Sequence, residues 1–237
     1  MEKAHLKANA SRPARSVKSS KARVLLVDDH PIVREGLTRV INAEADLCVC
    51  GQAVSHHAAL EAAASLQPDV AVVDISLEGS HGLELLKDLQ IQHPRLPVLI
   101  LSMHDEMLYA ERALRAGAKG YLMKREPPER LLAAIRKVLK GDLSFSDDIT
   151  SRIINLLSGT RGPNQALPIE RLSDRELQVL ERIGQGHSTR QIAATLCVSI
   201  KTVQAHREHI KEKLEIKDGT ALTRFAVHWV ESELRFG

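Results

Sequence analysis

The sequence predicts an α/β domain with a doubly wound, five-stranded parallel sheet, followed by a small all-α domain. Between residues 23 and 141, five apolar strand-like runs alternate with five helix-like segments, which is the pattern of a parallel sheet. One of these runs, DVAVVD, shows no polar alternation, as expected of a strand that is buried on both faces. Beyond residue 171 the apolar residues recur at helical spacing throughout, which predicts the second domain.

The predicted strands and helices follow one another without interruption along the first domain. Pro31 and Pro127 stand near the start of predicted helices, and Gly117 and Gly141 stand at or past the end of others, as these residue types prefer. The predicted strands are RVLLVDD, DLCVCGQAV, DVAVVD, LPVLILS and KGYLM, and the helices that follow them are PIVREGLTRVINA, HHAALEAAASLQ, HGLELLKDLQIQH, DEMLYAERALRAGA and PPERLLAAIRKVLKG.

The composition is that of an ordinary globular protein of 237 residues, which is enough for two domains of usual size. It is 43% hydrophobic and 27% charged, and an aromatic content of only 3% disfavours base-stacking platforms. No apolar run approaches the roughly 18 residues of a membrane span. The N-terminus lacks the apolar core of a signal peptide, so we expect a cytoplasmic protein with no membrane partner.

Three cysteines are spread along the chain at Cys48, Cys50 and Cys197. A metal site would require more ligands, and a disulfide would require an oxidising compartment. We therefore interpret all three as structural thiols.

Two segments lie outside the predicted domains. Residues 1–22 are polar, Ser-rich and strongly basic, which predicts a disordered tail that is either a solvated extension or a non-specific contact for DNA or acidic surfaces. Within residues 142–170, SDDITSRIINLLSG is compatible with a short helix, whereas TRGPNQALPIE contains Gly and Pro and predicts a linker. Two domains joined in this way can dock or separate.

Reactive side chains stand at the carboxyl ends of four of the five predicted strands: Asp28 and Asp29, Asp74, Ser102 and Lys124. Taken alone, Asp74 is compatible with either a turn cap or a ligand-binding group. In an open α/β sheet, however, the carboxyl ends of the strands share one edge, where ligands bind. The carboxylates would repel one another without a divalent cation such as Mg²⁺, and Ser102 and Lys124 would then face an anion. These are the parts that phosphoryl transfer requires.

Four segments, VLLVDDHPIVREGL, VVDISLEGSHGLELL, LILSMHD and GAKGYLMK, cover the domain from end to end. They closely resemble the receiver domain of bacterial two-component response regulators, which implies a flavodoxin-like fold. The resemblance implies that Asp74 accepts a phosphoryl group from the phosphohistidine of a sensor histidine kinase. It also implies that Asp29 and Asp74 ligate Mg²⁺, that Asp28 acts through water, and that the carbonyl of Ser76 completes the protein ligands.

The resemblance assigns roles to three further residues. It implies that Ser102 hydrogen-bonds the phosphoryl oxygens, that Lys124 pairs with them, and that Tyr121 is the rotameric switch aromatic. The chain departs from the family in the loop after the phosphoacceptor. It has Ser80 and His81 where an apolar residue followed by Asp or Asn is usual, so the expected detail of this loop is in doubt.

The second domain, residues 171–237, begins with two capping boxes, in which a Ser is followed three residues later by Glu or Gln. These boxes start at Ser173 and Ser188 and precede LQVLERIGQG and QIAATL. A short turn then leads to a longer helix from about residue 200 to residue 214. Two helices joined by so tight a turn have helix-turn-helix geometry.

The longer helix has a predicted buried side and a predicted exposed side. Steps of 100° place Val203, Ile210 and Leu214 inward. The remaining positions face outward or flank that surface: Lys201, Thr202, Gln204, Ala205, Glu208, Lys211 and Glu212. Residues 200–217 contain five basic and three acidic side chains. A balance of only +2 leaves open a solvated helix in an ordinary three-helix bundle.

The stretch LSDRELQVLERIGQGHSTRQIAATLCVSIKTVQAHREHIKEKL is similar over its whole length to the LuxR-type helix-turn-helix domain. The resemblance implies that Lys201, Gln204, Ala205 and Glu208 reach the major groove of double-stranded DNA, and that Thr202 contacts its backbone. Many relatives have Lys or Arg where this chain has Glu208. The glutamate either accepts a hydrogen bond from a cytosine amine or opposes a neighbouring charge.

The last helix, TALTRFAVHWVESEL, has two apolar stripes. One consists of Leu222, Phe225, Ala226 and Trp229, and can pack against the domain itself. The other consists of Val227, Val230 and Leu234, and the family supplies a dimer mate for it. A single broad core face is the alternative.

The sequence thus predicts a phosphorylation-controlled transcription factor of the LuxR-type (NarL/FixJ) subgroup, with double-stranded DNA, a sensor histidine kinase and a second copy of itself as partners. We expect no enzymatic turnover beyond phosphoryl acceptance and slow self-dephosphorylation. An aspartate-dependent phosphatase is one alternative, but it would have a second acid where this chain has Ser76. A DNA-binding protein with a relic receiver is the other, and the complete set of reactive residues argues against it.

Overall fold

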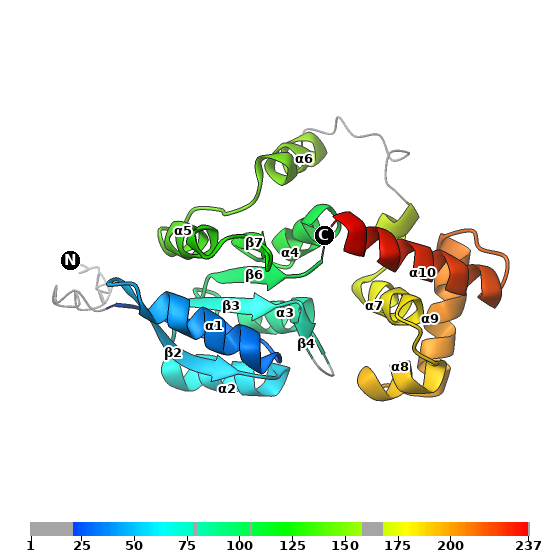
Figure 1. The fold of residues 1–237 in the computed structure, drawn as a ribbon, viewed down its shortest axis with the longest axis horizontal. Helices are drawn as coiled ribbons and strands as arrows, with labels where there is room; N and C mark the ends of the chain where they lie inside the picture. The colour runs from blue at the N-terminus through cyan, green and yellow to red at the C-terminus, as the bar shows by residue number, and fades with distance from the viewer. Residues whose placement is uncertain (1–20, 78–79, 105, 158–167, 237) are drawn as a thin grey trace, which may run out of the picture.

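The computed structural model describes residues 21–77, 80–104, 106–157 and 168–236 (Figure 1). The predicted basic tail lies outside the described residues up to position 20, and most of the glycine- and proline-containing linker also lies outside them. None of the helices in the described part is long and apolar enough to cross a membrane.

The first domain is built on a parallel sheet, as predicted. Its strands are β1 (Ala22–Val27), β2 (Leu47–Ala53), β3 (Val70–Asp74), β6 (Val98–Ser102) and β7 (Gly120–Met123), and their order across the sheet is β2-β1-β3-β6-β7. All neighbouring pairs are parallel. Every residue of β3 is buried, which explains the absence of polar alternation in DVAVVD.

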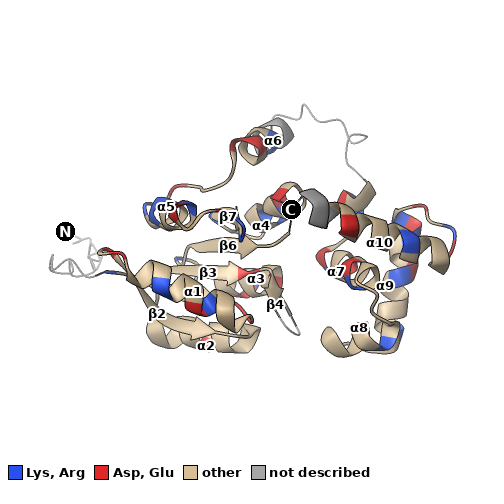
Figure 2. Cartoon of the chain, in the orientation of Figure 1, with Lys and Arg blue, Asp and Glu red and all other residues tan. Residues whose placement is uncertain are grey.

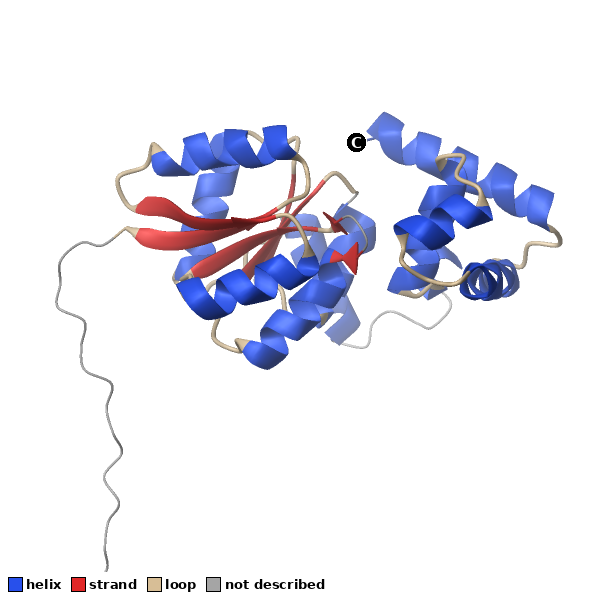
Figure 3. Ribbon diagram, turned by 90° about the horizontal axis from the view of Figure 1, so that it is seen from below, coloured by secondary structure: helices blue, strands red, loops and turns tan. Residues whose placement is uncertain are grey.

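Helices cover both faces of this sheet (Figure 3). Helices α1 (Pro31–Asn42) and α5 (Pro128–Leu139) pack on one face, and α2 (His56–Leu66), α3 (Gly82–Gln92) and α4 (Glu106–Arg115) pack on the other. Pro31 and Pro128 occupy the first turns of α1 and α5, where a missing N–H is tolerated. The two faces divide the side chains of β3 between them.

This division follows from the two-residue period of a strand. Val70 and Val72 belong to the core beneath α1 and α5, whereas Ala71 and Val73 belong to the core beneath α2, α3 and α4. Because both cores are apolar, no position of the strand is left for a polar side chain before its end. Asp74 is the first such position.

The loop after Asp74 contains a short hairpin that the sequence did not predict. Strands β4 (Ser76–Leu77) and β5 (Ser80–His81) pair antiparallel. Gly82 follows at once, and a Cβ atom there would lie 2.1 Å from the carbonyl oxygen of Asp74. Only glycine allows α3 to begin so close to the end of β3.

The segment between the domains contains the short helix that was compatible with its sequence. Helix α6 (Asp147–Leu157) contacts α4, and Ile149 in the first turn of α6 is fully buried. Ser144, just before α6, pairs with Gly120 at the edge of β7. The segment is therefore attached to the first domain before the chain leaves it.

The second domain is all-helical. After a 3₁₀ turn (Pro168–Arg171) come α7 (Asp174–Gly184), α8 (Thr189–Thr195), α9 (Ile200–Lys213) and α10 (Gly219–Phe236). Both capping boxes are present, with Ser173 and Ser188 as the capping residues.

Helices α7, α9 and α10 form the core of this domain. Val203 and Ile210 are fully buried on the inner side of α9, and Leu214 is half-buried. Gly184 lies where α10 crosses α7, and a Cβ atom there would lie 2.4 Å from the carbonyl oxygen of Ala226. This close crossing fixes where α10 lies.

The predicted apolar stripe of α10 is wrong at one position. Leu222 and Ala226 are fully buried and Trp229 is half-buried, but Phe225 is 38% exposed. Helices α7 and α9 cover only the middle of the predicted stripe. Phe225 lies at the margin of the stripe and therefore stays exposed to solvent. The side chain of Leu234, in the other predicted stripe, lies outside the described side chains.

Candidate functional site

The structure brings together four of the reactive residues at the carboxyl edge of the sheet. Asp28 directly follows β1, Asp74 ends β3, Ser102 ends β6 and Lys124 directly follows β7. The Nζ atom of Lys124 lies 2.7 Å from Oδ2 of Asp28 and 2.7 Å from Oδ2 of Asp74. All four side chains are buried or nearly so, so their charges interact strongly.

Burial dominates the electrostatics of this edge. It raises the pKa of Asp74 to about 6, with a further contribution from the negative charge of Asp28, although Lys124 acts in the opposite direction. Burial disfavours the charge on Lys124, but the Asp74 and Asp28 carboxylates outweigh it and raise the pKa of the amine. Lys124 is therefore a permanent positive charge placed between two carboxylates.

The acidic pocket beside Lys124 can hold a metal ion. Ligand atoms of Asp28, Asp29, His30 and Asp74 all lie within 4.8 Å of one another. The three carboxylates supply the oxygen ligands that Mg²⁺ prefers, so the residues present fit a hard divalent cation. His30 was not predicted: its Nδ1 atom lies 2.7 Å from Oδ1 of Asp29.

Two of the predicted phosphoryl-binding and switch residues make contact with the same unpredicted residue, His104. The Oγ atom of Ser102 accepts a hydrogen bond from the backbone N–H of His104 at 3.0 Å. The hydroxyl of Tyr121, which is 2% exposed, donates to the His104 carbonyl at 2.8 Å. The His104 imidazole lies 2.7 Å from the Oγ atom of Ser76 through its Nε2 atom.

The structure gives His81, one of the two residues that depart from the family in the loop after Asp74, a structural role. His81 is 2% exposed, and its Nδ1 atom accepts a hydrogen bond from the backbone N–H of Leu83, which caps α3. Burial lowers the pKa of His81 to about 3, so its imidazole is neutral at neutral pH. Its ring stacks on Tyr109 at 6.1 Å between centroids, and the ring of His104 lies 4.8 Å from the same tyrosine.

The acidic pocket opens into a cavity of about 740 Å³ that lies between the two domains. The first domain lines it with Asp29, His30, Asp74, Ser76, Met103, His104 and Lys124, and the second domain lines it with Glu181, Arg182, Gln185, Thr195, Trp229 and Val230. Figure 1 shows α7 and α10 beyond the ends of the strands. The His104 side chain faces the second domain: its Nε2 atom lies 3.8 Å from Oε1 of Glu181.

Two ion pairs hold the domains together beside this cavity. Asp174, at the start of α7, accepts from Nη1 of Arg112 at 3.0 Å and from Nζ of Lys87 at 3.1 Å. Arg112 also donates to the backbone carbonyl of Glu170 at 3.3 Å. Burial opposes the charge of Asp174, but the two cations outweigh it and lower the pKa of this carboxyl.

The predicted DNA-contacting residues lie on the exposed side of α9. Lys201, Thr202, Gln204, Ala205 and Glu208 are all exposed, and Figure 2 shows basic residues along this helix. The first domain covers none of these five side chains.

The surroundings of three residues from the predicted lists bear on their roles. Glu208 forms an ion pair with Lys211, one turn further along α9, at 2.7 Å. Val230 is half-buried and lines the cavity between the domains, and Val227 beside it is also half-buried.

Known families match both domains. Residues 24–136 match the response regulator receiver domain, and residues 170–226 match the LuxR family of bacterial regulatory proteins. The chain is 34% identical over 209 residues to the oxygen regulatory protein NreC of Staphylococcus carnosus, which covers 86% of this chain and 96% of that protein. The chain belongs to the LuxR-type response regulators. This response regulator is accordingly a transcription factor with a receiver domain and a helix-turn-helix domain.

Solved structures agree with this assignment. A LuxR-family response regulator from Aurantimonas is 35% identical and superimposes with a TM-score of 0.54 over 59% of this chain and 99% of that one. RcsB from Salmonella enterica serovar Typhimurium, bound to the rprA promoter with the phosphomimetic BeF₃⁻, has a TM-score of 0.63 and covers 88% of this response regulator and 99% of its own chain. At 24% identity the RcsB likeness supports the fold alone.

Proposed function

We propose that this response regulator accepts a phosphoryl group on Asp74 from the phosphohistidine of a sensor histidine kinase. The observation that carries the proposal is the position of Asp74 at the strand end, with the Lys124 ammonium 2.7 Å from its carboxylate. A carboxylate oxygen of Asp74 forms the new bond to phosphorus while the bond from phosphorus to the histidine nitrogen breaks. The product is an acyl phosphate, and the electron pair stays on the departing imidazole.

Asp29, Asp74 and the carbonyl of Ser76 would hold Mg²⁺, with Asp28 acting through water, and the ion would neutralise charge on the phosphoryl oxygens. The carboxylate geometry described above supports this cofactor. In the structure Lys124 pairs with Asp28 and Asp74. We propose that its ammonium turns to the phosphoryl oxygens when they arrive, because the new group then carries the larger negative charge. The Oγ atom of Ser102 supplies a hydrogen bond to the same oxygens.

We propose that α9 is the recognition helix for double-stranded DNA. Lys201, Gln204, Ala205 and Glu208 would reach the major groove and Thr202 the DNA backbone, and the exposure of all five side chains supports this. The ion pair of Glu208 with Lys211 favours the role of opposing a neighbouring charge over hydrogen bonding to cytosine.

A homodimer formed through Val227, Val230 and Leu234 of α10 is the proposed DNA-binding species. One relative, RcsB, is described as two dimers bound to two parallel DNAs. In this response regulator the docked receiver borders Val230 and leaves α9 exposed. This supports masking of the dimer face, as opposed to the recognition helix, before phosphorylation.

Phosphorylation would loosen this docking through His104. Ser102 and Tyr121 both hydrogen-bond to the His104 backbone, and the His104 side chain faces Glu181 of the second domain. When Ser102 turns to the phosphoryl oxygens, it releases the N–H of His104, and the contact across the cavity moves with that loop. A regulator that meets a kinase and DNA in this way would work in the cytoplasm.

The test is phosphorylation of the purified protein by acetyl phosphate with Mg²⁺. We expect one base-labile phosphoryl group per chain, and none in Asp74→Asn. Asp69→Asn, which lies at the opposite end of β3, is the matched control and should accept as much as the parent. Undiminished uptake by Asp74→Asn would refute the assignment of Asp74, whereas no uptake by the parent would favour a relic receiver.

A further inference from the structure

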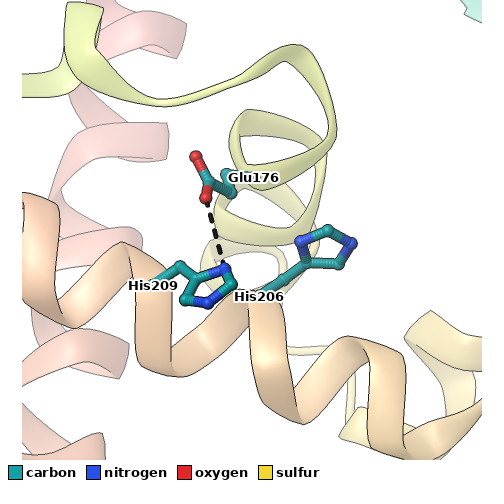
Figure 4. Close-up of side chains that lie close together, drawn as sticks. All are labelled: Glu176, His206 and His209. Atoms are coloured by element: carbon teal, nitrogen blue, oxygen red, sulfur yellow. Dashed lines mark ion pairs between the residues drawn. The ribbon is translucent and has the colours of Figure 1, made fainter.

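Three potential metal ligands meet in the second domain, away from the phosphoacceptor (Figure 4). Glu176 comes from the first turn of α7, and His206 and His209 stand three residues apart on α9. Their ligand atoms all lie within 4.8 Å of one another. Residues three apart on a helix share a face, so both imidazoles are on the side of α9 that approaches α7.

The carboxylate of Glu176 is held in place by other contacts. It is 4% exposed, and its Oε2 atom accepts from the backbone N–H of Ser173 at 2.7 Å and from Nζ of Lys213 at 2.6 Å. Its other oxygen, Oε1, faces Nδ1 of His209 at 3.8 Å. The capping box thus orients the side chain through one oxygen and leaves the other directed toward the histidines.

The two histidines differ in what they bring to the cluster. Burial lowers the pKa of His206 against the pull of Glu176, and the nearby Arg175 reinforces the shift, which favours the neutral imidazole that ligates metals. His209 is 58% exposed, so its ring can rotate without displacing core side chains.

We propose that Glu176, His206 and His209 form a binding site for a divalent transition-metal ion of the Zn²⁺ class. Two imidazole nitrogens and one carboxylate oxygen are a recurrent zinc ligand set that leaves a fourth position for water, and imidazole equally suits Ni²⁺ and Cu²⁺. Bond lengths of about 2.0–2.1 Å require the ligand atoms to come closer than they are now. Rotation of the exposed His209 provides that movement.

The Lys213 ammonium is the charge that a metal ion would compete with. Its side chain is 39% exposed, so it can leave Glu176 for solvent. Substitution of Lys213 should therefore change metal affinity in the opposite direction to substitution of the three ligands. Removing the positive charge of Lys213 should strengthen metal binding, because the ion then meets one less like charge.

A bound ion would connect α7 directly to α9. At present Glu176 joins these helices through its ion pair with Lys213 at 2.6 Å and a longer one with His209 at 3.8 Å. Metal bonds would replace these ion pairs with direct bonds from both helices to one ion. Metal binding should therefore raise the thermal stability of the full-length protein, since an ion that binds only the folded state stabilises it.

The experiment is calorimetric titration of untagged full-length protein with Zn²⁺, in excess Mg²⁺ to fill the acidic pocket. We expect His206→Gln, His209→Gln and Glu176→Gln each to weaken Zn²⁺ binding by at least about tenfold. Mutating a residue that only hydrogen-bonds to a metal ligand usually costs that much, and loss of a ligand itself should cost no less. Glu176→Gln keeps the capping box, in which Gln also serves. His228→Gln, an exposed histidine on α10, is the matched control and should bind like the parent.

Two further measurements keep the proposal open to refutation. Asp29→Ala should retain the Zn²⁺ affinity of the cluster, and Lys213→Gln should raise it. Equal Zn²⁺ binding by the parent and His206→Gln, or loss of binding in Asp29→Ala, would overturn the proposal. Phosphoryl uptake from acetyl phosphate should be unchanged in His206→Gln, so the proposed phosphoacceptor role is tested separately.

Discussion

Lys124 and Asp74 stand 50 residues apart in the sequence, and the ammonium of one lies 2.7 Å from the carboxylate of the other. The pair is buried, and the second carboxylate of Asp28 shares the same ammonium. One positive charge therefore serves two acids before any metal or phosphoryl group arrives. When both carboxylates are ionised they repel each other, and a bound cation relieves this repulsion. The pocket therefore has an affinity for cations.

The first prediction concerns pH. Because burial raises the pKa of Asp74 to about 6, the folded protein binds more protons than the unfolded chain between about pH 4 and pH 6. Ionisation of Asp74 therefore costs stability that grows as pH rises through this window, up to roughly 3 kcal/mol. Asp74→Asn should stabilise the metal-free protein at about pH 8, and the gain should shrink toward about pH 4.

Thermal melts in a chelator measure this difference. Asp142→Asn, an exposed carboxyl, should change the melting temperature little and equally across the range. An Asp74→Asn variant that is less stable than the parent at high pH would show that pairing with Lys124 outweighs burial.

The second prediction concerns the metal pocket. Asp29→Ala should weaken Mg²⁺ binding and slow phosphorylation while it leaves the fold intact, since removing one acid relieves repulsion. Glu35→Ala, an exposed acid on α1, is the matched control. Fluorescence or calorimetric titration with Mg²⁺ decides the question, and unchanged affinity in Asp29→Ala would leave the acidic cluster without this role.

The third prediction concerns DNA. Lys201→Ala and Gln204→Ala should each weaken binding to a target sequence by roughly 1–3 kcal/mol if the side chain contacts a base. On random DNA the loss should be smaller for Gln204, because only a charge contributes through counterion release. Gel-shift titrations on both DNAs compare the variants, and an equal loss on both for Gln204→Ala would mean that it reads no base.

The fourth prediction concerns docking. Arg112→Gln should break the ion pair with Asp174, separate the domains and raise DNA binding by the unphosphorylated protein. Arg115→Gln is the matched control on the same helix, because Arg115 pairs with Glu111 of α4 itself. Small-angle scattering and gel shifts measure the two effects. If Arg112→Gln stayed compact and bound DNA no better, this contact would not hold the docked state.

Much of the fold could be predicted because its signals are local. The apolar run before Asp74 predicts a buried strand from its composition, and the shared strand edge then places Asp28, Ser102 and Lys124 beside it. The capping box at Ser173 likewise depends on neighbours within one turn. The Phe225 prediction failed because a helical wheel gives a direction for each side chain but not the width of the surface opposite it.

The contacts around His104 could not be predicted in this way. They join His104 to Ser76 of β4, Tyr109 of α4 and Tyr121 of β7, and to Glu181 through the docking of another domain. Arg112 and Asp174 lie 62 residues apart in the sequence, and no local sequence pattern predicts that they pair. Such contacts depend on how complete helices, strands and domains pack against one another.

The position of the cavity between the domains has a kinetic consequence. Asp74 faces the second domain across about 740 Å³, a space that admits a small phosphodonor but not a folded protein. If a kinase phosphorylates Asp74 as proposed, its domain should reach this side chain only after the two domains have parted. At high kinase concentration the rate of phosphotransfer should thus stop rising and equal the rate of domain opening, whereas the rate with acetyl phosphate should keep rising beyond that limit.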